Sequence, residues 1–211
     1  MTVETLLETR RKNGSEFVPI DALWRVSVAQ YHAMIASGAL TKDNPIELLQ
    51  GWLVQKMPKN PKHSTVTRIL RKLLSELVGQ GWYVDSQEPL TTADSEPEPD
   101  IMIVQGTEMD YLDHHPGPDE VALVIEVSEA TLNRDRTLKK QLYAAATVPV
   151  YWIVNLLDSQ VEVYSQPFIG VAGPDYKQRQ TYTLSETVPV RVGTDSIGEI
   201  PVVRLFPESR P

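Results

Sequence analysis

The stretch that decides the fold is VALVIEVSEATLNRDRTLKKQLYAAATVPVYWIVN, residues 121–155. Its first eight residues are almost all apolar and rich in valine, which is typical of a buried strand. Residues 134–146 contain lysine, leucine and alanine at helical spacing, and residues 151–157 are strand-like again. The stretch therefore predicts a strand, a helix and a second strand.

Further elements are predicted on both sides of this unit. Ser27 and Gln30 form a capping box for a short helix that Gly38 ends, and Ser64 is a plausible N-cap for a longer helix. Gln50-Gly51 predicts a hairpin turn. The remaining expected elements are strands: 82–90, 100–104, 161–166, 177–184 and 200–206. Helices fall between strands without strict alternation, so we expect an α/β (α+β) class with a mixed sheet.

Composition limits the possible classes of protein. The chain has 211 residues, 41% of them hydrophobic, with 20 Lys and Arg against 28 Asp and Glu, a formal net charge of −8. We expect one domain over residues 26–206, an N-terminal arm over 1–25 and a C-terminal tail over 207–211. No cysteine and no long apolar segment are present, so we expect a cytoplasmic protein with no membrane partner. The acidic balance argues against generic nucleic-acid coating.

Charge is distributed unevenly along the chain. Six basic residues and no acid lie between residues 56 and 72, whereas residues 73–133 contain no Lys or Arg and many acids. Most of these charges are expected on solvated faces. Asp100 and Glu126 are different, because Asp100 opens an apolar strand and Glu126 lies within one, on the face predicted to carry Ala122 and Val124.

A buried carboxylate needs a partner, because an isolated charge in a protein interior costs several kcal/mol. Two carboxylates on adjacent strands would raise each other's pKa unless a cation neutralised them. Oxygen ligands without cysteine favour Mg²⁺ or Mn²⁺ over zinc. On the following helix we expect a buried stripe of Leu138, Leu142 and Ala145, with Lys139 able to reach inward and Lys140 directed to solvent.

The order Pro99-Asp100, Glu126 and an inward Lys139 resembles the PD-(D/E)XK nuclease superfamily. Its usual lysine two residues after the glutamate is replaced here by Ser128, so the chain resembles the variant whose lysine has migrated to the neighbouring helix. Residues 26–206 resemble, more narrowly, a bacterial family of uncharacterised proteins regarded as restriction endonucleases. The resemblance implies a restriction-endonuclease-like mixed β-sheet flanked by helices.

The same resemblance implies roles for single residues. Asp100, Glu126 and the backbone carbonyl of Val127 would bind the metal, and Lys139 would be the catalytic base or a phosphate stabiliser. The resemblance also makes Glu47 and His63 candidate accessory residues, Glu47 among the catalytic group. Each has a structural alternative: a charge at a strand end for Glu47 and a surface residue for His63. Tyr143 is expected to be a packing residue.

The expected function is a Mg²⁺- or Mn²⁺-dependent endonuclease that hydrolyses DNA, with a homodimer as the expected assembly. The basic run would hold the nucleic-acid backbone, and its candidate contacts are Lys59, Lys62, His63 and Arg68. Two alternatives remain open. One is a catalytically inactive module that binds nucleic acid or protein on the same fold, and the other is a hydrolase of a different phosphate ester.

Overall fold

A computed structural model describes residues 22–206, so most of the predicted arm and the whole predicted tail lie outside the described residues. Its centre is a six-stranded sheet with the order β3-β4-β5-β6-β7-β8. Only β5 and β6 run parallel among the neighbouring strands of this sheet. The strands are β3 (Trp82–Asp85), β4 (Ile101–Gln105), β5 (Val121–Ser128), β6 (Val150–Asn155), β7 (Gln160–Gly170) and β8 (Gly173–Tyr182). The mixed α+β class expected from the sequence is confirmed.

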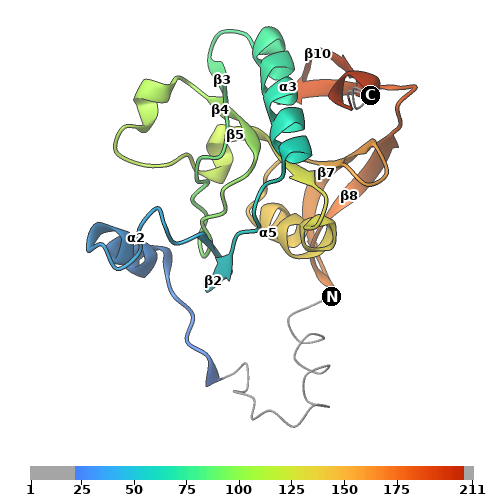
Figure 1. Ribbon diagram of the computed structural model, residues 1–211. Helices are drawn as coiled ribbons and strands as arrows, with labels where there is room; N and C mark the ends of the chain where they lie inside the picture. Colours follow the sequence, from blue (N-terminus) through green and yellow to red (C-terminus); the bar gives the residue numbers. More distant parts are fainter. Residues whose placement is uncertain (1–21, 207–211) are drawn as a thin grey trace.

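Helices cover the two faces of the sheet (Figure 1). Helix α3 (Pro61–Leu77) packs on one face through Val66, Leu70 and Leu74, together with the small hairpin of β9 (Thr187–Val192) and β10 (Asp195–Pro201). Helix α5 (Lys140–Ala145) packs on the other face against β7 and β8. The sheet is therefore the middle layer, and each of its faces has its own hydrophobic core.

Strand β5 is buried along its whole length. Ile125 and Val127 belong to the core under α3, whereas Val124 belongs to the core under α5. Ala122 was predicted to share a face with Glu126, but it packs in the α3 core. The pairing with β4 shifts between Ile103 and Val104, and such an irregularity changes the alternation of side chains at this end of the strand.

The first elements follow the sequence prediction closely. Helix α2 (Val28–Ala36) begins at Ser27, whose hydroxyl accepts a hydrogen bond from the Gln30 N–H in the predicted capping box. Strands β1 (Ile46–Leu49) and β2 (Trp52–Gln55) form the predicted hairpin. Both turn residues have positive φ, 50° at Gln50 and 78° at Gly51, as a two-residue hairpin turn requires.

Helix α3 begins one turn earlier than predicted. Its N-cap is Asn60, whose side-chain oxygen accepts a hydrogen bond of 2.9 Å from the His63 N–H, and Pro61 occupies the first helical position. Proline is well tolerated there because that N–H has no helical partner. The assignment of Ser64 as N-cap was wrong, and the earlier start places His63 within the helix.

The segment after β5 also differs from the prediction. It consists of α4 (Leu132–Arg134), a π-helical turn η4 (Asp135–Lys139) and α5. The wider π-turn shifts the helical phase. Tyr143 is buried and Ala145 is exposed, although Ala145 was expected in the buried stripe, and Leu138 is only partly buried. Lys140 pairs with Asp175 instead of pointing freely to solvent. Lys139 does turn inward, as predicted.

The end of the described chain is less extended than predicted. Residues 200–206 were expected to form a strand, but β10 ends at Pro201 and a 3₁₀ helix, η5 (Val202–Leu205), follows. The loop between β4 and β5 contains two further 3₁₀ turns, η2 (Glu108–Tyr111) and η3 (Pro118–Glu120). Within residues 22–206, no helix has the length and apolar character to span a membrane.

The N-cap of α3 can be tested directly. Asn60→Ala removes the side-chain acceptor for the His63 N–H, so we expect the free energy of unfolding to fall by about 1 kcal/mol. Ser64→Ala should change it by no more than about 0.5 kcal/mol, since Ser64 is already inside the helix. Urea denaturation of both variants measures the difference. A larger loss for Ser64→Ala would contradict the observed start of the helix.

Candidate functional site

A cavity of about 90 Å³ lies where the linker between β2 and α3 meets the end of β5 and the start of the following helix. Its lining includes all four predicted catalytic residues and also Val127, Lys59 and His63. Residues far apart in the sequence therefore meet at one place. The predicted site residues that line it are Glu47, Lys59, His63, Asp100, Glu126, Val127 and Lys139.

Glu126 is the most constrained of these residues. It points from β5 towards the helix, with 5% of its surface exposed, and its Oε1 accepts hydrogen bonds from Lys139 Nζ at 2.8 Å and from the Tyr143 hydroxyl at 2.7 Å. Burial raises the pKa of Glu126 to about 8, although Lys139 opposes the shift. Among the described residues none donates a hydrogen bond to Oε2.

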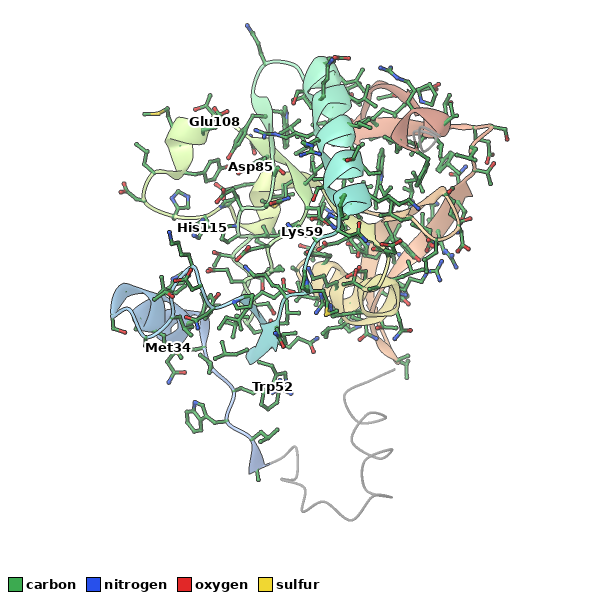
Figure 2. All side chains as sticks on the ribbon, in the orientation of Figure 1. Met34, Trp52, Lys59, Asp85, Glu108 and His115 are labelled. Carbon is green, nitrogen blue, oxygen red and sulfur yellow. The ribbon has the colours of Figure 1, made fainter. Side chains whose placement is uncertain are left out.

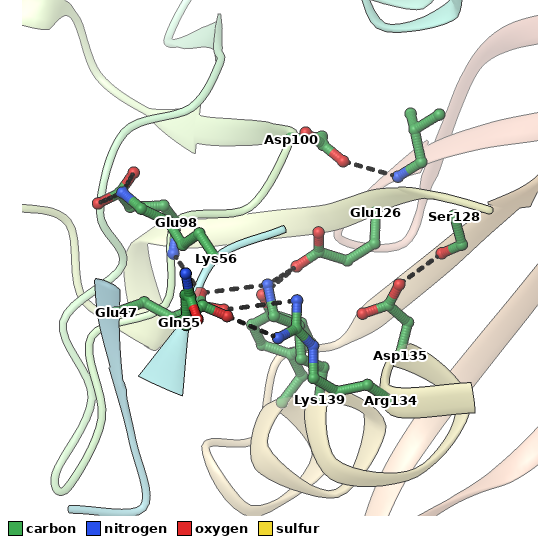
Figure 3. Close-up of polar contacts among 12 residues, drawn as sticks. Glu47, Gln55, Lys56, Glu98, Asp100, Glu126, Ser128, Arg134, Asp135 and Lys139 are labelled. Carbon is green, nitrogen blue, oxygen red and sulfur yellow. Dashed lines mark hydrogen bonds and ion pairs between the residues drawn. The ribbon is translucent and has the colours of Figure 1, made fainter. Parts of the chain in front are cut away.

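Lys139 joins two carboxylates. Its ammonium group lies 2.8 Å from Glu126 Oε1 and 3.3 Å from Glu47 Oε2, and the lysine is 3% exposed (Figure 3). Burial alone would lower the pKa of Lys139, but the charges of Glu126 and Glu47 raise it above its usual value. Arg134 approaches Glu47 Oε1 at 3.9 Å from the same helical segment. Glu47 is therefore part of a buried ion-pair network with Lys139 and Arg134, and is not simply a charge at the end of a strand.

Asp100 lies at the start of β4, next to β5 (Figure 3). Its Oδ2 accepts hydrogen bonds from the Val127 N–H at 2.9 Å and His63 Nε2 at 3.0 Å, and Lys59 Nζ lies 3.4 Å from Oδ1. Burial would raise the pKa of Asp100, but the hydrogen bond and charge of His63, followed by Lys59 and Val127, hold it below its usual value. Asp100 is therefore an ionised carboxylate.

The donor chemistry of the cavity fits a hard divalent cation. Asp100 Oδ1 and Glu126 Oε2 are not occupied by the hydrogen bonds that hold these two side chains. The N–H and C=O of one strand residue point to the same side, so the Val127 carbonyl faces the side of Asp100. No group of three or more His, Asp or Glu side chains suited to a metal occurs within residues 22–206. Mg²⁺ is compatible with this set, because it commonly takes one or two carboxylates and keeps several waters.

Two predicted nucleic-acid contacts lie outside the cavity. Lys62 donates a hydrogen bond of 2.8 Å to the Leu156 carbonyl, and Arg68 contacts the Thr65 hydroxyl at 3.3 Å on the exposed side of α3. His63, in contrast, contacts Asp100 and is largely buried. The interpretation of His63 as a surface residue was wrong, since the early start of α3 turns its side chain towards β4.

Sequence reasoning missed several polar members of the site. Tyr143 was assigned to packing, yet its hydroxyl binds Glu126. Its spacing of four residues from Lys139 places both on one helix face and could have indicated the contact. Ser128, which stands where the superfamily usually has lysine, donates a hydrogen bond of 2.7 Å to the buried Asp135.

The mixed sheet flanked by helices, with carboxylates at neighbouring strands and an inward lysine, defines a protein of the restriction-endonuclease-like class. A family model matches residues 28–196, which is most of the chain, and its description is "Putative restriction endonuclease". The chain therefore belongs to the Uma2 family, and the narrower resemblance noted in the sequence is confirmed.

A solved structure agrees with this fold. The chain is similar to a crystal structure described as a putative nuclease belonging to DUF820 from Anabaena variabilis ATCC 29413, with a TM-score of 0.61 and 14% sequence identity. The similarity covers 86% of this chain and 97% of the other. At this identity it supports the fold alone. No curated protein matches the chain.

The buried pair can be tested through the pH dependence of stability. Lys139→Met leaves Glu126 without its ammonium partner, so its folded-state pKa should rise above about 8. When a carboxyl group has a raised pKa in the folded state, the free energy of unfolding of the protein falls as pH increases. The decrease is at most about 1.4 kcal/mol per pH unit and stops once the pH has passed the folded-state pKa. The destabilisation caused by Lys139→Met should therefore be about 1 kcal/mol larger at pH 9 than at pH 6.

Urea denaturation at the two pH values measures this change. Lys140→Met is the matched control, because Lys140 pairs with Asp175 and not with Glu126. Its effect on the free energy of unfolding should be nearly the same at both pH values. Equal effects of Lys139→Met at pH 6 and pH 9 would contradict the buried contact between Lys139 and Glu126.

Proposed function

We propose that the chain is a divalent-metal-dependent endonuclease that hydrolyses phosphodiester bonds of DNA. The observation that carries the proposal is the cavity itself. Two carboxylates from neighbouring strands, Asp100 and Glu126, open on it beside the buried ammonium group of Lys139. Membership of a family described as restriction endonucleases supports the same chemistry.

Asp100, Glu126 and the Val127 carbonyl would hold Mg²⁺ or Mn²⁺. When bound, such an ion supplies Lewis-acid chemistry, since it polarises a phosphoryl oxygen and lowers the pKa of water. The protein's part is to fix its ligands in advance. The Val127 N–H and His63 hold Asp100 through Oδ2, and Lys139 and Tyr143 hold Glu126 through Oε1. Each carboxylate thereby keeps its other oxygen available.

Lys139 acts in this proposal as a cation and not as a base. Glu126 and Glu47 raise its pKa, so the side chain keeps its proton at neutral pH. A permanent ammonium group can donate hydrogen bonds to phosphate oxygens as negative charge develops in the transition state. The resemblance left two roles for Lys139, base or phosphate stabiliser, and the proposal takes the second.

The DNA backbone would approach across the linker before α3. Lys59 lines the cavity, and Lys62 and Arg68 follow on the first turns of the helix. Lys59 would contact a phosphate next to Asp100, whereas Lys62 and Arg68 would contact phosphates further from the cavity. The part of the chain that the structure describes brings Asp100, Glu126 and Lys139 together at a single cavity, so cleavage of both strands at one position would use two copies. A homodimer in the cytoplasm is therefore part of the proposal.

Two observations favour a second candidate, a catalytically inactive nucleic-acid-binding module. Ser128 replaces the usual lysine, and the three carboxylates of the network already have cationic partners within the chain. Calorimetry with Mg²⁺ and Mn²⁺ separates the two. Tight ion binding that Asp100→Asn abolishes would favour the nuclease, whereas salt-dependent DNA binding without ion binding would favour the module.

Cleavage assays test the proposed activity. Purified protein with Mg²⁺ or Mn²⁺ should cut plasmid DNA, and Asp100→Asn should reduce the rate by about 100-fold or more. Asp113→Asn is the matched control, since Asp113 is exposed in the loop between β4 and β5. Its rate should stay within about twofold of the unchanged protein. Failure of the folded protein to cut DNA with either ion would refute the proposal.

A further inference from the structure

Three lysines near the cavity have different partners. Lys56 Nζ donates to both carboxylate oxygens of Glu98 at 2.8 Å, and Lys62 Nζ donates to the Leu156 carbonyl at 2.8 Å. Lys59 is the one of the three that contacts Asp100, with Nζ 3.4 Å from Oδ1. Figure 2 shows Lys59 at the N-terminal end of α3.

The contact involves the carboxylate oxygen that the ion would need. Asp100 Oδ2 already accepts hydrogen bonds from the Val127 N–H and from His63, so Oδ1, which faces Lys59, is the oxygen left for an ion. A Mg²⁺ ion binds a carboxylate oxygen at about 2.1 Å. Its two positive charges would then lie within a few ångströms of the Lys59 ammonium group, and like charges at that range repel strongly. Lys59 and the ion therefore compete for Asp100.

We propose that Lys59 exchanges partners between Asp100 and a nucleic-acid phosphate, and so couples ion binding to substrate binding. Without the ion, Lys59 stays on Asp100 and neutralises it. With the ion in place, Lys59 turns outward and contacts the phosphate backbone. This inference rests on the proposed function, because it needs a divalent ion and a nucleic acid at the same site.

The structure makes the exchange inexpensive. The Lys59 side chain is 39% exposed against 6% for Asp100, so the ammonium group stays partly hydrated in the pair and loses little when it leaves. Pro58 and Pro61 on either side restrict the backbone of the linker, so the movement is a rotation of the side chain. The flexible four-carbon stem of lysine allows the ammonium group to move by several ångströms. The hydrogen bonds that hold Asp100 through Oδ2 are not disturbed.

The exchange predicts opposite effects on the two ligands. Removal of Lys59 eliminates a competitor for Asp100, so the ion should bind more tightly. The same change eliminates a phosphate contact that forms only when the ion is present. The variant should therefore bind DNA more weakly than the unchanged protein when the ion is present, and equally well when it is absent. A lysine with a purely structural role would not produce this pattern, because coupling between two ligands is reciprocal.

Ion binding is measured first, by calorimetry with Mg²⁺ or Mn²⁺ alone. Lys59→Met should bind the ion about fivefold more tightly than the unchanged protein. Lys56→Met is the matched control, since it also removes a positive charge from the cavity lining but its partner is Glu98. Its effect should be clearly smaller. Circular dichroism and thermal melting confirm that both variants are folded.

DNA binding is measured second, by fluorescence anisotropy of a labelled duplex in EDTA and in Ca²⁺, with electrophoresis to verify that the duplex stays intact. The unchanged protein and Lys59→Met should bind equally in EDTA. In Ca²⁺ the variant should bind about threefold to fivefold more weakly, with a salt dependence smaller by about one phosphate contact.

The outcomes separate this inference from the proposed function. If the unchanged protein binds the ion and cuts DNA but Lys59→Met binds the ion no more tightly, the exchange is overturned and the nuclease stands. A DNA-binding deficit of equal size in EDTA and in Ca²⁺ also overturns it. If the unchanged protein binds no divalent ion, the proposed function fails, and the exchange fails with it.

Discussion

The burial of the Glu126 carboxylate in the middle layer of the fold is the constraint on which the site depends. A charge inside a fully buried strand must be neutralised and hydrogen-bonded nearby. The next helical segment supplies both partners: Lys139 and Tyr143, four residues apart, donate hydrogen bonds to the same oxygen, Oε1 of Glu126. The π-helical turn that ends at Lys139 sets the helical phase at which both side chains point to β5. The π-helical turn thus allows both donors to reach the buried Glu126 carboxylate.

The same requirement explains why Glu47 belongs to the network. Lys139 is itself buried, and its ammonium group has three N–H donors, of which Glu126 accepts one. Glu47 comes from the hairpin of β1 and β2, outside the central sheet, and contacts Lys139 at 3.3 Å. The hairpin is thereby tied to the sheet and the helix by one ammonium group. The linker that carries Lys59 follows directly after this hairpin, so the network also fixes where that linker starts.

Charge and hydrophobicity were sufficient to predict that Asp100 and Glu126 lie together, because few physical arrangements tolerate two carboxylates among apolar neighbours, and both residues do line one cavity. Period-two and helical patterns likewise located most strands and α2. The errors have a common origin in features that depend on tertiary contacts. A π-turn, a register shift at Ala122 and a helix start at Asn60 leave no simple periodic signal, and each changes which side chains face inward. His63 and Tyr143 were misjudged for this reason.

The cavity, like the chain as a whole with its net charge of −8, contains more acidic than basic residues. Six carboxyl groups line the cavity, with four Lys and Arg side chains among them, so the formal excess is two negative charges once Glu126, whose pKa burial raises, has lost its proton. A phosphate group that approached this lining alone would be repelled. One divalent cation offsets the excess, and the released Lys59, whose charge is already part of this balance, moves that charge to the mouth of the cavity. An acidic protein can therefore accept a nucleic acid at this place, provided that ion binding comes first or together with it.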